Sequence, residues 1–253
     1  MKRRRTWIVV AGALSILALG IVGAAASSSA ENSSAKSASA TASSDPATQI
    51  LNAIDSPRVV SLKTQDGTAE AIGQATSSQG DAARSMWYTT VAGSAFAEQV
   101  GVRQMSFTVV DSSSGTTLEN DRDFVSLNQV DPFEKITLSA SDVDNLVNQQ
   151  AQSLGVKVIS IHYVGLYGGG AEIVVQPDDP GVVPGSFINA LLGPLAAQNR
   201  PNLVTVVDAN GAPQLVIGWA PGVGGWDSQG MEWVAPGVQT DTVSAWLPAP
   251  SGS

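Results

Sequence analysis

The sequence contains no cysteine, and this absence excludes several kinds of chemistry. Disulfides, thiolate nucleophiles, thiolate metal sites and a lipid-modified cysteine after an export signal all need that residue. An exported domain of this length does not depend on disulfides, because about 200 residues can bury an adequate hydrophobic core.

Histidine is nearly absent as well, since His162, in the segment SIHYV, is the one histidine of the chain. A Ser-His-Asp triad would have to use it as the base, and the sequence has no GxSxG segment. One histidine also cannot build a histidine-rich zinc site. We therefore interpret His162 as a structural strand residue, and the sequence predicts no catalytic residue, no metal site and no cofactor.

Positive charge is scarce outside the N-terminus. Of the 13 Lys and Arg residues, four lie at positions 2–5, whereas all 22 Asp and Glu residues lie after residue 26. The remainder therefore has 9 basic and 22 acidic residues, a net charge of −13. Such a surface repels phosphate groups and anionic polymers, so nucleic acid is not an expected partner.

The first 26 residues have the pattern of an export signal. A basic block at 2–5 precedes an uncharged apolar run at 7–26, and small residues follow. A run of about 20 residues is also long enough to span a bilayer, so a cleaved signal peptide and an uncleaved membrane anchor both stay open. In either case the positive-inside rule sends the rest of the chain outward. We expect a secreted or cell-surface protein whose contact with the membrane, if uncleaved, is residues 7–26.

A flexible linker is expected at 27–44, where Ser and Ala dominate. The folded, extracytoplasmic domain is expected at 45–253, with two possible sub-halves at 45–125 and 135–250. Asp45 is a suitable N-cap, and Pro46 suits the first position of a helix.

The middle of the chain alternates helices with pairs of strands. The segment 141–154 places its apolar residues on one helical face, with Ser141 as the expected N-cap and Gly155 as the stop. A β-branched strand, a glycine turn and a second strand follow, at 156–176.

The same order of elements recurs elsewhere. A helix over 81–101 precedes a strand whose Met105, Phe107 and Val109 share one face. A helix over 186–198 precedes a strand at 202–207 and the turn DANG, where Asn210-Gly211 is expected to have positive φ. Another copy is expected to begin at Pro46.

These patterns predict an α+β fold of three to four repeated helix–β-hairpin units, with antiparallel sheet(s) and the helices packed on one face. The order of elements resembles PepSY-type and other small extracytoplasmic inhibitor or chaperone folds. The likeness rests on element order without a motif, and no family is assigned from it.

Acidic clusters are the candidates for a metal or for carboxylate chemistry: Glu119, Asp121, Asp123, Asp178 and Asp179. Alternating acids suit calcium, but the glycine and closing glutamate of a calcium loop are missing, so we interpret them as solvated loops. A carboxylate pair could also serve a glycosidase, although nothing selects one pair.

Aromatic residues are the candidates for binding, because tryptophan stacks on sugars and anchors protein partners. They gather in the Gly/Pro-rich C-terminal segment and one hairpin tip: Trp219, Trp226, Trp233, Trp246 and Tyr167. Burial as lids over the core is the competing interpretation of the tryptophans. We expect a non-enzymatic module that binds a protein or a cell-wall polymer. The alternative is an extracellular carbohydrate- or peptide-acting hydrolase that uses a carboxylate pair.

Overall fold

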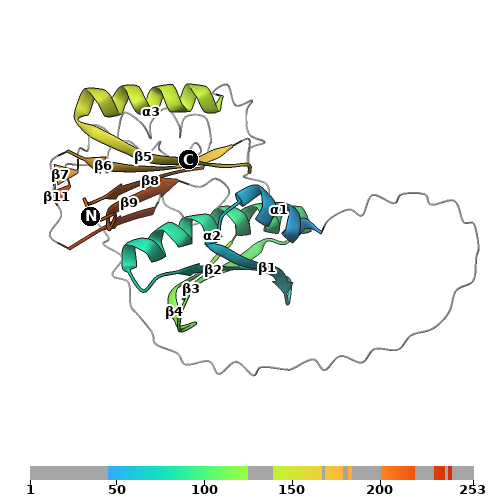
Figure 1. The fold of residues 1–253 in the computed structure, drawn as a ribbon. Coiled ribbons are helices and arrows are strands. Elements are labelled where there is room, and N and C mark those ends of the chain that lie inside the picture. The colour runs from blue at the N-terminus through green and yellow to red at the C-terminus, as the bar shows by residue number, and fades with distance from the viewer. Residues whose placement is uncertain are drawn as a thin grey trace, which may run out of the picture.

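The computed structural model of this chain is an α+β protein with two separate mixed β-sheets (Figure 1). It describes residues 45–124, 139–166, 169–178, 182–183, 201–219, 231–236 and 239–240. No helix in this described part is both long and apolar enough to cross a membrane. The apolar run 7–26 and the expected helix 186–198 lie outside the described residues.

The first sheet has four strands in the order β1-β2-β3-β4. Its elements are α1 (Pro46–Ile54), β1 (Val59–Gln65), β2 (Thr68–Ala75), α2 (Gln79–Val100), β3 (Gln104–Asp111) and β4 (Thr117–Phe124). As the alternation predicted, Met105, Phe107 and Val109 of β3 are all buried.

The second sheet has five strands in the order β10-β9-β8-β6-β5. Its elements are α3 (Ala140–Leu154), β5 (Val156–Val164), β6 (Gly170–Pro177), β8 (Asn202–Val207), β9 (Pro213–Trp219) and β10 (Met231–Val234). Two short strands, β7 (Val182–Val183) and β11 (Gln239–Thr240), form a separate parallel pair.

The expectation of antiparallel sheets is corrected, because both sheets are mixed. Each hairpin is antiparallel, but β2 pairs with β3 in parallel and β6 pairs with β8 in parallel. A parallel pair needs a long crossover between its strands, and α2 supplies it between β2 and β3. Local sequence patterns predict each hairpin, but they do not predict whether strands of neighbouring hairpins pair in parallel or antiparallel.

Helix α2 lies between the two sheets, with α3 on the far side of the second sheet (Figure 1). One face of α2 carries small residues that allow close approach to the first sheet: Ser85 donates to the Gln74 carbonyl, and a Cβ on Gly93 would come within 2.9 Å of Ala71 and Met105. Its other face carries Trp87, which packs against Leu203 and Gly218 of the second sheet. The expected packing of helices on a single sheet face is therefore not confirmed.

Two apolar cores follow from this layering. The larger one surrounds α2 and includes residues from both sheets, among them Val164, Leu203 and Val216 of the second. The smaller one lies between α3 and the opposite face of the second sheet, around Val143 and Ile173.

The starts of the helices follow from capping. Asp45 accepts a hydrogen bond from the Thr48 amide and Pro46 opens α1, both as predicted. The N-cap of α3 is Ser139 and not the expected Ser141. Ser139 and Asp142 form a reciprocal capping box, which satisfies two backbone N–H groups instead of one.

Replacing Ser139 with alanine is expected to lower the free energy of unfolding by about 1 kcal/mol, because the first turn of α3 loses its cap. Ser141→Ala, two residues further on and exposed, is the matched control and should be close to neutral. Urea unfolding followed by circular dichroism measures both. Equal effects for the two variants would contradict this cap assignment.

The turn at Asn210-Gly211 differs from the prediction, because only Gly211 has a positive φ among these two residues. The Asp208 carboxylate instead accepts hydrogen bonds from the amides of Asn210 and Ala212.

The turn between β3 and β4 is built in the same way, with Asp111 accepting from the Ser113 and Ser114 amides. The Ser113 hydroxyl also donates to Asp111, and this bond, followed by those from the Ser114 amide and hydroxyl, holds the pKa of Asp111 well below its usual value.

Both β1 and β5, edge strands of their sheets, contain one extra residue. Val59 pairs with Gly73 and Ser61 with Ile72, so Val60 is a bulge. In β5, Val158 pairs with Val175 and Ser160 with Val174, so Ile159 is a bulge. Each of these two side chains is 46% exposed.

Candidate functional site

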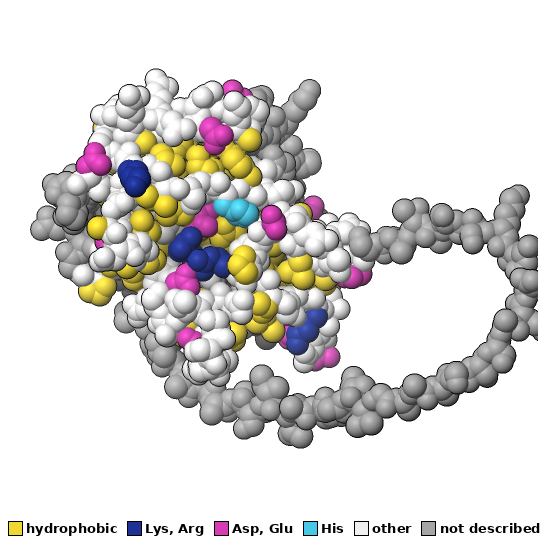
Figure 2. Space-filling view, viewed as in Figure 1, with side chains coloured by type: hydrophobic (Ala, Val, Ile, Leu, Met, Phe, Trp, Pro, Cys, Tyr) yellow, Lys and Arg dark blue, Asp and Glu magenta, His cyan; other side chains and the backbone are white. Residues whose placement is uncertain are grey.

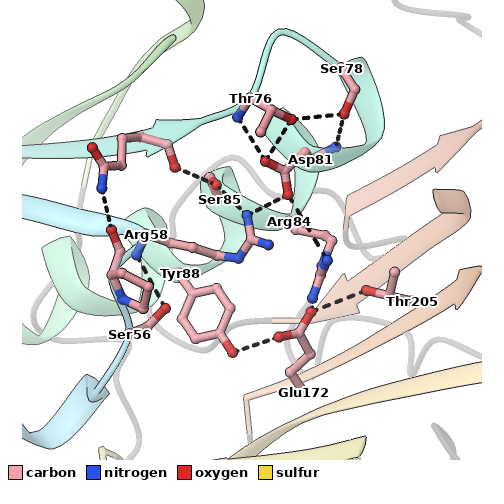
Figure 3. A network of polar contacts seen from close by, with 12 residues as sticks. Ser56, Arg58, Thr76, Ser78, Asp81, Arg84, Ser85, Tyr88, Glu172 and Thr205 are labelled. Carbon is pink, nitrogen blue, oxygen red and sulfur yellow. Dashed lines mark hydrogen bonds and ion pairs between the residues drawn. The ribbon is translucent and has the colours of Figure 1, made fainter. Parts of the chain in front are cut away.

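Four charged residues of alternating sign form a line through three layers of the fold (Figure 3). Arg58, just before β1, contacts Asp81 of α2 at 2.6 Å, and Arg84 of α2 contacts Glu172 of β6 at 2.7 Å. Arg84 also lies 4.0 Å from Asp81, which joins the two pairs. We call Arg58, Asp81, Arg84 and Glu172 the charge line.

Glu172 is the buried end of the charge line. It accepts hydrogen bonds from Arg84 Nε at 2.7 Å, from the Tyr88 hydroxyl at 2.8 Å and from the Thr205 hydroxyl at 3.3 Å. Three donors on one carboxylate offset the cost of burying its charge. Burial, together with the neighbouring Glu172 charge, raises the pKa of the Tyr88 hydroxyl, so this phenol stays protonated and donates.

Asp81 is the outer acid of the charge line, and its net pKa lies below the ordinary 3.8. Burial by itself would raise this pKa. The hydrogen bond from the Thr76 amide and the charge of Arg58 outweigh that effect and favour the carboxylate. The ionised Asp81 side chain therefore connects α2 to Arg58, just before β1, and to the Thr76 amide, just after β2.

Asp81→Asn is expected to make the protein less stable at neutral pH and less sensitive to acid. A carboxyl group with a lowered pKa in the folded state stabilises the fold above its unfolded pKa, and this contribution disappears as pH falls through the folded pKa. The stability difference between wild type and Asp81→Asn should thus be full above about pH 5 and shrink below pH 3.8. Denaturant unfolding at several pH values measures it, and a difference that stays constant down to pH 2 would refute the assignment.

His162 lies beside this cluster on the edge strand β5. Its Nε2 is 3.3 Å from the carbonyl of Ile54, the last residue of α1, and its ring is 6.1 Å from the Tyr88 ring. It is the strand partner of Glu172. In the space-filling view, basic, acidic and histidine side chains meet near the middle of one face, among hydrophobic side chains (Figure 2).

Of the five predicted aromatic side chains, the described part of the chain includes only that of Trp233. Trp233 lies on β10, partly buried against the larger core, where its ring would contact a Cβ placed on Gly80. Trp219 ends β9, and its side chain is outside the description. Trp226, Trp246 and Tyr167 lie outside the described residues.

The predicted acidic clusters do not form a site within the described residues. Glu119, Asp121 and Asp123 lie on strand β4, so the expectation of a solvated loop is wrong for this cluster. The side chains of Asp121 and Asp123 lie outside the described residues. Asp178 follows β6, where its amide donates to the Gly155 carbonyl, and Asp179 is outside the described part. Among the described residues, no three His, Asp or Glu side chains gather as a metal site would need.

The charge line was not predicted from the sequence, although one signal for it exists. Glu172 interrupts the apolar segment AEIVV, and a charged residue in a buried strand needs a partner. Its partners come from α2, more than 80 residues earlier. Local patterns cannot identify them.

Comparison with known proteins adds no family. No family model and no curated protein matches this chain. A solved structure, the crystal structure of a sex pheromone precursor from Lactobacillus salivarius subsp. salivarius UCC118, is 11% identical with a TM-score of 0.25. The match covers 68% of this chain and 65% of that one, so this chain spans less than two thirds of that protein's length. A likeness of this size carries no argument about fold or function.

Proposed function

We propose that this chain is an exported, non-enzymatic binding module built from two copies of one unit, whose shared described elements are a helix and two β-hairpins. The proposal that the module is not an enzyme is supported by the contacts of Asp81 and Glu172, the two acids of the charge line. Asp81 and Glu172 are each held by an arginine and by further hydrogen bonds, so both are engaged in joining elements. The pKa of Asp81 is lowered, so this carboxyl group is not suited to the role of the general acid of a hydrolase.

The first support for two copies is the pairing of the sheets. The strand order β1-β2-β3-β4 corresponds to β5-β6-β8-β9, and in both sets the pairs are antiparallel, parallel and antiparallel in turn. The corresponding halves are the ones expected at 45–125 and 135–250.

The second support is a short identical sequence that occurs in corresponding strands of the two halves. The tetrapeptide TVVD occurs at 108–111 and again at 205–208, in the corresponding strands β3 and β8. In both places its aspartate caps the following hairpin turn. A register shift also occurs at the two valines of both copies.

The third support is the bulged edge strand. RVVSL at 58–62 corresponds to KVISI at 157–161, and the bulge residues Val60 and Ile159 occupy the same position in the two segments. A shared bulge is informative because bulges are retained within families. Equivalent strands, equivalent turns and equivalent bulges together favour two copies of one unit.

The test of the function is a titration of the purified full chain with three probes: calcium, soluble cell-wall fragments and small glycans. A binding module should change its tryptophan fluorescence with one probe and leave that probe chemically intact when the mixture is analysed by chromatography. New products that disappear in both Asp81→Asn and Glu172→Gln would instead establish the hydrolase and overturn this proposal.

A further inference from the structure

The second half of the chain rests on α2 through two different kinds of contact. Toward β8, β9 and β10 the contact is apolar, where Trp87 meets Leu203 and Gly218, and Gly80 meets Trp233. Toward β6, close to the β5 edge, the polar bonds of Glu172 with Arg84 and Tyr88 are added to an apolar contact that includes Val164. An apolar contact is non-directional, whereas bonds to a buried carboxylate fix one geometry.

The glutamate of the first half that corresponds to Glu172 has a different partner and a different exposure. With the strands matched as above, Glu172 corresponds to Glu70, which pairs with Lys63 on the same sheet. Glu70 keeps 27% of its side chain exposed and Glu172 only 6%. In the first half, the glutamate at this position forms a surface ion pair with Lys63. In the second half, the corresponding Glu172 is buried and binds Arg84 of the first half.

We propose that Glu172 is a latch that holds the second half in one orientation on α2, and that loss of its charge lets the halves pivot about the Trp87 contact without unfolding. The pivot is possible because the apolar contact survives when the carboxylate is neutral. Two carbonyl groups of α1 also contact the second half near Glu172. The Ala53 carbonyl accepts a hydrogen bond from the Gly165 amide, and the Ile54 carbonyl lies 3.3 Å from His162 Nε2. This inference does not depend on what the chain binds.

Replacing Glu172 with glutamine removes its charge and leaves the surrounding charges in place. The charged and titratable groups that face it are Arg84 and Tyr88 from α2 and His162 from β5, with Asp81 and Arg58 further along the charge line. Two arginines surround two acids here, so neutralising either acid leaves excess positive charge at the joint.

The test measures the distance between the halves in the full chain. Because the sequence has no cysteine, Ser112→Cys and Ala209→Cys provide the two labelling sites for spin labels and double electron–electron resonance. Both positions are exposed, and each directly follows the aspartate of a TVVD segment. The labelled parent should show one narrow distance distribution at neutral pH.

Glu172→Gln in this background is expected to broaden or shift the distribution, and Glu70→Gln, the matched control, to leave it unchanged. An unchanged distribution in Glu172→Gln, or equal broadening in Glu70→Gln, would overturn the latch. If Glu172→Gln does not fold, Tyr88→Phe decides: a broader distribution supports the latch and the parental width refutes it.

Discussion

Trp87→Ala is expected to lower the free energy of unfolding by about 3–5 kcal/mol, the usual cost of removing a fully buried tryptophan. Trp87 is completely inaccessible to solvent and stacks edge-on against Tyr88 at a ring distance of 4.9 Å. Its ring also lies against Gly218, where a Cβ would come within 2.7 Å of it. The backbone of β9 is therefore part of the cavity wall, and it cannot collapse without moving the sheet.

Urea unfolding followed by far-ultraviolet circular dichroism measures this effect, since the substitution alters the fluorescence itself. Trp233→Ala is the control, because this ring is only partly buried and packs at the margin of the same core. It should lose clearly less stability than Trp87→Ala. A loss below about 1 kcal/mol for Trp87→Ala would show that Trp87 does not join the two sheets.

The first half alone, residues 45–124, is expected not to form a stable native fold. In the whole chain α2 is covered by a sheet on each side, and the fragment would expose Trp87 and Tyr88 and remove Glu172 from Arg84. Each large apolar side chain returned to water costs about 1.5–3 kcal/mol, which is large against the total stability of a small domain.

The fragment should bind a hydrophobic dye, lack near-ultraviolet circular dichroism and unfold without a sharp transition, whereas the full chain unfolds cooperatively. A fragment that unfolds cooperatively at the same temperature as the full chain would mean that the two halves are independent domains. It would also mean that the second sheet contributes nothing to α2.

What the sequence predicted correctly is local. The helix that starts after Asp45 and the helix that ends at Gly155 depend on capping residues within one turn, and the structure confirms both. The buried face of β3 follows from alternation along a single strand. Each of these features depends on neighbours a few residues away.

What the sequence did not predict depends on distant residues. The parallel pairing of β2 with β3 is decided by a 22-residue helix that crosses between them. The strand β10 has only four residues, too few for a strand pattern to be recognised, and it pairs with β9. Glu172 stands in an apolar segment, and its partners Arg84 and Tyr88 come from the other half. The repeated TVVD was visible in the sequence, but its meaning depends on the register of strands that the sequence does not give.

The two bulged strands affect how this protein behaves at high concentration. An unpaired edge strand can accept a strand from another molecule, and a long regular edge invites such pairing. Val60 in β1 and Ile159 in β5 interrupt the spacing of hydrogen-bonding groups along their strands, and each strand also carries a lysine, Lys63 or Lys157. Bulges and lysines are two of the means by which edges resist such pairing. The edge strands β1 and β5 thus share a bulge and a lysine that oppose pairing with a strand of another molecule.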